Sequence, residues 1–145
     1  MSSKDVTSGK IDWSNIKYIP LSLHEELHQR VAPKRGDILL AKNGTTGISA
    51  IVDTDEVFDI YVSLALLRFI PGHNIHYLWA ALNMPETKAQ FNESLKGIGV
   101  PNLHLSEIKK TSIIVPPIDK QNTFAIFVQQ LDKSKFTLHR LLQIF

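Results

Sequence analysis

The most constraining feature of the sequence is a change of hydrophobic pattern at Pro116-Pro117. Beyond this pair, apolar residues recur three or four positions apart, and no glycine or proline interrupts them up to the last residue. This spacing predicts one long amphipathic helix of the coiled-coil type, whose apolar stripe packs against a partner. We therefore expect a domain over residues 1–117 and a helix over residues 118–145. The apolar residues expected on the partner side of the helix are Phe124, Phe127, Leu131, Leu138, Leu141 and Phe145.

Residues 1–117 alternate short helical and short extended patterns, which favours a mixed, strand-rich α+β domain. Ser22 and Glu25 have the spacing of a capping box and predict a helix over 22–31. Asn43-Gly44 is typical of a two-residue hairpin turn, so we expect it to join strands over 38–41 and 45–52. The other expected elements are a strand over 60–70, two helices over 77–95 that meet near Pro85, a helical turn over 105–109 and a strand over 111–115.

Composition limits the classes of function. A chain of 145 residues with 43% hydrophobic residues has room for one domain with a buried core. The absence of cysteine excludes disulfides, thiolate zinc sites and cysteine nucleophiles. No apolar run approaches the roughly 20 residues of a membrane span and no signal peptide is evident, so we expect no membrane partner and a cytoplasmic location. The net charge of +2 neither requires nor excludes a polyanionic partner.

His24, Glu25 and His28 spell the H-E-x-x-H signature of zinc metalloproteases. In such enzymes two imidazoles on one helical face bind the metal, and the glutamate acts as general base. Here the helix is cut short by Pro33, and the third ligand would have to be Glu56 or another distant acidic residue that no spacing rule selects. We therefore favour a solvent-facing amphipathic helix with two chance histidines and predict no metal and no cofactor. A zinc hydrolase is the minor alternative.

Three segments in this order resemble the target-recognition half of type I restriction-modification specificity subunits. The first is residues 34–47, with Gly36-Asp37-Ile38-Leu39 followed by Gly44-Thr45-Thr46-Gly47. The second is the glycine loop over 97–103, followed by a leucine-isoleucine pair and the double proline. The third begins at Gln121 and is similar to the opening of that family's conserved spacer helix. Together the three cover the chain from about Ile19 onward.

The resemblance implies a non-catalytic subunit that reads one half of a split DNA site. It implies that the spacer helix pairs with a second copy or a second specificity half. It also implies docking to DNA methyltransferase (modification) subunits and, indirectly, to the restriction subunit, in a bacterial or archaeal cytoplasm. Members of the family carry several dozen residues before the segment that matches Ile19, so we expect the first strands of the domain to be missing here. The alternative is a shortened fragment that only dimerises or binds partner subunits.

The candidate DNA contacts are basic residues and short polar residues near the turn and the glycine loop. Lysine and arginine attract phosphates, whereas an asparagine amide presents the donor and acceptor that match adenine in the major groove. Glycines next to them expose backbone N–H groups. The full set is Lys34, Arg35, Lys42, Asn43, Gly44, Thr45, Thr46, Lys96, Gly97, Asn102 and His104.

Overall fold

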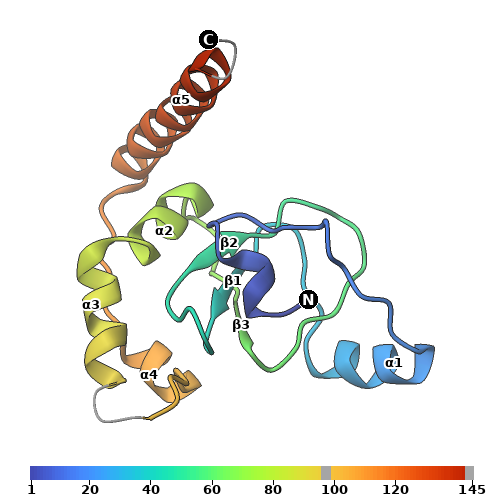
Figure 1. Cartoon of the computed structure of the whole chain (residues 1–145). Helices are drawn as coiled ribbons and strands as arrows, with labels where there is room; N and C mark the ends of the chain where they lie inside the picture. The colour runs from blue at the N-terminus through green and yellow to red at the C-terminus, as the bar shows by residue number, and fades with distance from the viewer. Residues whose placement is uncertain (96–98, 143–145) are drawn as a thin grey trace.

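The protein is described by a computed structural model that covers residues 1–95 and 99–142, with the backbone alone for Phe136, Leu138, Leu141 and Leu142. Lys96, Gly97 and Phe145 lie outside the described residues. A small sheet stands at the centre, helices cover one side of it, and the C-terminal helix projects away from the rest (Figure 1). The elements are η1 (Ser3–Val6), α1 (Leu21–Arg30), β1 (Ile38–Ala41), β2 (Ser49–Ile51), β3 (Leu64–Leu67), α2 (Ile75–Leu82), α3 (Pro85–Ser94), α4 (Leu105–Lys110) and α5 (Ile118–Leu142).

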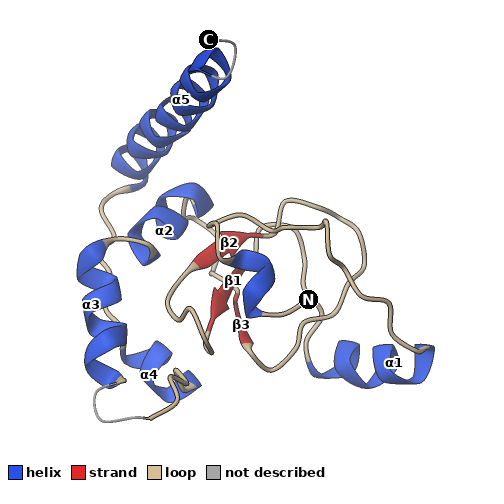
Figure 2. Ribbon diagram, in the orientation of Figure 1, coloured by secondary structure: helices blue, strands red, loops and turns tan. Residues whose placement is uncertain are grey.

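The predicted α+β class is confirmed. The three strands form an antiparallel sheet in the order β2-β1-β3, with β1 in the middle (Figure 2). Leu39 of β1 lies opposite Ala50 of β2 and Leu66 of β3, and this register places the three side chains on one face of the sheet. All four residues of β1 are fully buried because neighbours cover both of its edges and both of its faces.

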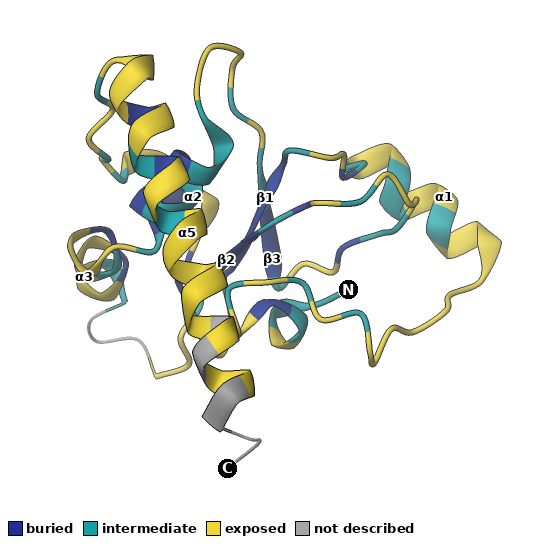
Figure 3. Ribbon diagram, turned by 90° about the horizontal axis from the view of Figure 1, so that it is seen from above, coloured by how far each residue is buried: buried dark blue, intermediate teal, exposed yellow. Residues whose placement is uncertain are grey.

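Each face of the sheet packs against different parts of the chain. Leu39 and Ala41 face a cluster built from Val6 of η1 and from loop residues such as Val52 and Ile60. On the opposite face, Ile38 packs against α2. Leu40 packs against Phe91 of α3, against Ile108 of α4 and against Leu103, which precedes α4. Figure 3 shows the strands as the buried centre, with the outer sides of the helices exposed. The alternation of residues along β1 thus holds the two layers together.

The helices of the middle segment agree with the sequence prediction. The break between α2 and α3 falls at Pro85, which occupies the first turn of α3, where a missing N–H is tolerated. Asn74 caps α2 by accepting hydrogen bonds from the backbone N–H groups of His76 and Tyr77. No described helix is long and apolar enough to cross a membrane.

Two predicted strands are much shorter than expected, and one is absent. β2 occupies Ser49–Ile51 within the predicted 45–52, and β3 occupies Leu64–Leu67 within the predicted 60–70. Residues 111–115 form no strand. Their backbone is held by side chains instead: Gln90 accepts from the Ser112 N–H and donates to its carbonyl, and Tyr77 donates to the Ile114 carbonyl. One side-chain amide and one tyrosine hydroxyl thus replace hydrogen bonds that a strand ladder would otherwise supply.

The predicted capping box of α1 is also wrong. The helix begins at Leu21 after Pro20, and no side chain caps its N-terminus. The ring of Pro20 fixes its φ, which is -59°, and its carbonyl accepts from the N–H groups of Leu23 and His24, so the first turn starts before Ser22.

The hairpin between β1 and β2 is confirmed, but its predicted two-residue turn is wrong. A turn of that type needs positive φ at both central residues, and no described residue other than glycine has positive φ. The ladder instead ends where Gly47 donates to Ala41 and Ala41 donates to Ile48, which leaves a wider loop. Gly44 and Gly47 adopt φ of 71° and 79° in this loop, which we call the 42–47 loop.

We predict that Gly47→Ala destabilises the protein by about 2 kcal/mol, since both backbone and packing oppose a methyl group there. A Cβ at Gly47 would lie 2.9 Å from Cδ2 of the buried Phe91, in addition to the strained positive φ. Gly44→Ala is the matched control, because its φ is similar but nothing lies within 4 Å. Urea denaturation should give a smaller loss for Gly44→Ala, of about 1 kcal/mol. Equal losses would show that the Phe91 contact contributes nothing.

Candidate nucleic-acid interface

The 42–47 loop is tied to the segment that precedes α4. Asn43 and Asn102 form an isolated antiparallel bridge pair, and the Leu103 N–H donates to the Lys42 carbonyl over 2.8 Å. The Lys42 N–H donates to the Ser63 carbonyl on the other side, also over 2.8 Å. Buried Leu103 anchors the incoming segment in the core. Candidates that are about sixty positions apart in the sequence are therefore brought together at one end of the sheet.

The groups gathered there suit contact with a polyanion. Lys42, Asn43 and Asn102 are half-buried, whereas Gly44 and Thr45 are exposed at the tip of the loop. Among the described residues, the Lys42 ammonium forms no ion pair, so it is available to a phosphate. The bridge uses backbone atoms, which leaves the two asparagine amides as candidate donors and acceptors.

Lys34 and Arg35 lie at the opposite end of β1 from the 42–47 loop. Arg35 is also engaged: its Nε and Nη2 donate to the Asp55 carboxylate over 2.8 to 3.0 Å, and its Nη1 donates to the Asp53 carbonyl. This hydrogen-bonded pairing raises the pKa of Arg35 and lowers the pKa of Asp55, both of which are exposed. The structure therefore does not gather the predicted basic residues on one surface, and Asp53 and Asp55 already occupy the Arg35 side chain.

His104 lies directly after Leu103 as the exposed N-cap residue of α4, and its side chain makes no capping hydrogen bond. It is next to the bridge pair in the chain, on the same side of the sheet as the 42–47 loop. Thr46, half-buried, completes the loop. The contact roles of these residues remain predictions.

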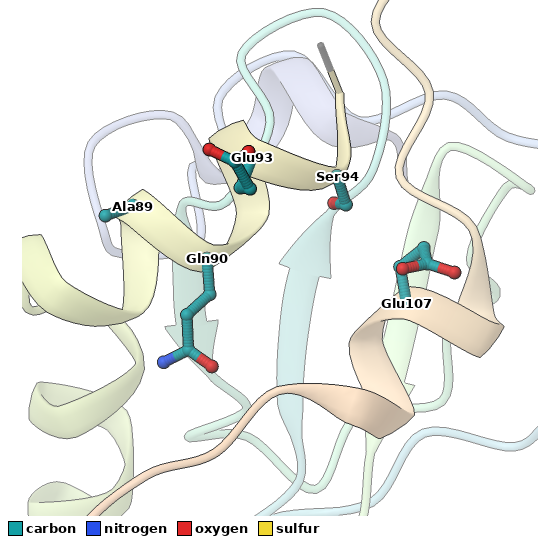
Figure 4. A pocket seen from close by; sticks show the side chains of 5 residues that line it. All are labelled: Ala89, Gln90, Glu93, Ser94 and Glu107. Carbon is teal, nitrogen blue, oxygen red and sulfur yellow. The ribbon is translucent and has the colours of Figure 1, made fainter.

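A shallow hollow of about 450 Å³ lies between α3 and α4 (Figure 4). The side chains of Ala89, Gln90, Glu93, Ser94 and Glu107 line it. Two carboxylates on its walls disfavour a phosphate, and Gln90 is already committed to Ser112. This hollow therefore does not extend the candidate interface.

The start of α5 is part of the domain core. Gln121 is 1% exposed; its Oε1 accepts from the Asn74 N–H over 2.9 Å, and its Nε2 donates to the Pro116 carbonyl over 2.8 Å. Phe124 packs edge-on against Tyr77 with 5.6 Å between ring centroids, and Ala125 is buried beside it. The structure thus places Phe124, which we expected to face a partner, against its own chain.

Farther along α5, apolar side chains are uncovered. Ile126, Phe127 and Leu131 are 57%, 56% and 43% exposed. For Phe127 and Leu131, pairing with a partner helix stays a prediction. Leu138 and Leu141 belong to the described backbone of α5, but their side chains lie outside the described part of the chain, as does all of Phe145.

The two histidines of α1 are partly exposed, and each also turns a ring nitrogen to one carboxylate that the sequence interpretation did not single out. Nδ1 of His24 lies 2.7 Å from Oδ2 of Asp59, and Nδ1 of His28 lies 3.2 Å from Oδ1 of the same carboxylate. The sequence pointed to Glu56 as the example of an acidic residue near these histidines, and it did not single out Asp59. Several acidic residues lie between 53 and 59, and no spacing rule says which of them a loop brings to the helix.

Comparison with known proteins identifies the family. The profile of the type I restriction modification DNA specificity domain matches residues 2–144. The chain belongs to this family. The resemblance drawn from the sequence is therefore confirmed.

Individual members of the family are distant. The specificity subunit of the type I restriction enzyme EcoBI from Escherichia coli is 24% identical over 130 residues, which are 88% of this chain and 27% of that subunit. The crystal structure of the HsdS subunit from Thermoanaerobacter tengcongensis matches with a TM-score of 0.61 at 17% identity, over 76% of this chain and 29% of that one. A structure from work on complex assembly and conformational transition of the type I R-M system matches with a TM-score of 0.61 at 18% identity, over 76% and 26%. The two structures show a shared fold, and this chain spans less than a third of each relative.

We predict that Gln121→Leu lowers the free energy of unfolding by about 2 kcal/mol, because it leaves the Asn74 N–H and the Pro116 carbonyl without partners while keeping the side-chain volume. The matched control is Asn122→Ala, which removes only an exposed hydrogen bond to the Asn74 side chain. Urea denaturation followed by circular dichroism measures both. If Gln121→Leu lowered the free energy of unfolding no more than the control does, the hydrogen bonds of Gln121 would not be what holds the start of α5 against the domain.

Proposed function

We propose that this chain is a sequence-specific DNA-binding module of a type I restriction-modification system. It reads one half of a bipartite site and docks to methyltransferase subunits, and through them it acts with the restriction subunit. Its role is recognition rather than catalysis. Family membership supports the general assignment, and the arrangement of the 42–47 loop supports the position of the DNA face.

The observation that carries the proposal is the joining of Lys42, Asn43 and Asn102 at one end of the sheet. Lys42 supplies the attraction to phosphate that all DNA sequences share. Asn43 and Asn102 supply amides that can read base edges, and the exposed tip at Gly44 and Thr45 lets backbone N–H groups approach the duplex. Lys96 and Gly97, outside the described residues, precede Asn102 in the sequence and are proposed to extend this face.

The exposed apolar stripe on α5 favours a helical partner. Phe127 and Leu131 lie four residues apart, so they share one face of α5, and both are exposed. We assign this stripe to pairing with a second specificity half or a second copy of this chain.

Variants of Lys42 and Asn102 should separate attraction to DNA phosphates from recognition of bases. Lys42→Ala should weaken binding to all duplexes alike and reduce the slope of log affinity against log salt by about 0.9, since one phosphate contact is lost. Asn102→Ala should instead change the sequences selected from a randomised duplex pool, because base contacts specify. Fluorescence titration over a range of salt concentrations and sequencing of the selected pool are the measurements.

Lys17→Ala is the charge-matched control, because it removes an exposed lysine from the lead-in to α1. It should leave both the salt slope and the selected sequences unchanged. If Lys42→Ala, Asn43→Ala and Asn102→Ala all left affinity and preference as they are, the DNA face would be wrongly placed.

The exposed stripe also favours a second candidate function, a shortened fragment that only binds partners through α5. Sedimentation of the intact chain, alone and with duplex DNA, distinguishes the two. Stable self-association that Leu131→Ser abolishes, together with DNA binding at nonspecific background only, would favour the fragment.

A further inference from the structure

Helix α1 is an outlying element that is held by few contacts. It stands apart from the sheet, on the side away from α5 (Figure 1), and none of its residues is buried. Its described polar links to the rest of the chain come from His24 and His28, which reach Asp59, and from Arg30, which donates to the Ile60 carbonyl. The two histidines are therefore central to how α1 is positioned.

The position of Asp59 is fixed by its neighbours in the chain. Ile60 is 3% exposed in the core, and the Tyr61 N–H donates to the Met1 carbonyl over 2.8 Å. The Asp59 side chain is itself only 7% exposed, whereas the histidine side chains are 31% and 35% exposed. A buried carboxylate thus lies under two imidazoles that reach solvent on their other side.

We propose that His24, His28 and Asp59 form a binding site for a divalent transition-metal ion of the zinc class. One ligand atom from each residue lies within 4.8 Å of the other two. His24 and His28 are one helical turn apart, so both rings lie on the same face of α1. Both present Nδ1 to the carboxylate, so the candidate ligand atoms of the three residues already face one another.

The donor set selects the class of ion. Two imidazoles and one carboxylate suit Zn²⁺ and Co²⁺ and give a hard ion such as Mg²⁺ or Ca²⁺ too few oxygens. Around an ion with tetrahedral bonds of about 2.0–2.2 Å, ligand atoms lie about 3.4 Å apart. The His24–Asp59 contact of 2.7 Å would therefore open and the wider separations would close, which side-chain rotation of the half-exposed histidines allows. Water would complete the coordination on the exposed side. The ion would bridge α1 to the loop between β2 and β3, which carries Asp59, on a part of the molecule separate from the 42–47 loop.

The test is titration of the intact chain with Zn²⁺ by calorimetry and with Co²⁺ by visible absorption, near pH 7.5, where imidazole is largely neutral. We expect one ion per chain and a rise in the melting temperature with Zn²⁺. His28→Gln and Asp59→Asn should each weaken binding by about tenfold or more, since each removes a ligand. His73→Gln, which removes an exposed histidine after the Pro71-Gly72 turn, is the control and should bind as the native chain does.

Two outcomes would overturn the proposal. One is the absence of binding heat at millimolar Zn²⁺, and the other is binding that the His28 and Asp59 variants leave unchanged. If a variant fails to fold, the site is tested on the native chain instead. Histidine ring signals in its nuclear magnetic resonance spectrum should shift with Zn²⁺ for His24 and His28 and not for His73, and shifts confined to other histidines would refute the site.

Discussion

The burial of β1 is the constraint on which the rest of the structure depends. Its four residues are fully inaccessible, and they contribute to all three hydrophobic clusters of the domain. A strand that is covered on both faces and paired along both edges cannot shift its register without exposing apolar side chains on every side. The segments attached to its two ends are therefore held at fixed positions, and these segments carry most of the predicted site residues.

The two ends of β1 carry different chemistry. At its start, the buried carboxylate of Asp37 accepts from the Lys34 N–H over 2.7 Å and from Nε and Nη2 of Arg68 over 2.8 and 2.7 Å. This pairing raises the pKa of Arg68, and it satisfies a charge that would be costly to bury alone. The charged groups at this end are paired within the chain, Asp37 with Arg68 and Asp55 with Arg35. At the other end Lys42 has no acidic partner among the described residues, so that end is the better candidate for DNA.

The sequence predicted those features that local chemistry decides. The apolar run of β1 and the break at Pro85 depend on residues within a few positions, and both were placed correctly. The failures come from long-range contacts. Residues 111–115 read as a strand, but Gln90 satisfies their backbone from a helix about twenty positions earlier. The turn at Asn43-Gly44 was mistaken because the loop is shaped by its bridge to Asn102, which no local pattern encodes.

In α5, the predicted spacer helix, long-range contacts also decided what the local pattern could not. Periodicity assigned Phe124 to the partner stripe, because a 3-4 pattern cannot distinguish the partner's core from the chain's own. The structure divides α5: Gln121, Phe124 and Ala125 seat its first turns against α2, whereas Phe127 and Leu131 are exposed. A buried amide with two backbone partners tolerates little rotation, since any tilt breaks a hydrogen bond in a site closed to water. The direction of α5 is thus fixed relative to the sheet, and through β1 relative to the 42–47 loop. A partner bound to the exposed stripe would therefore be held at a defined position with respect to the proposed DNA face.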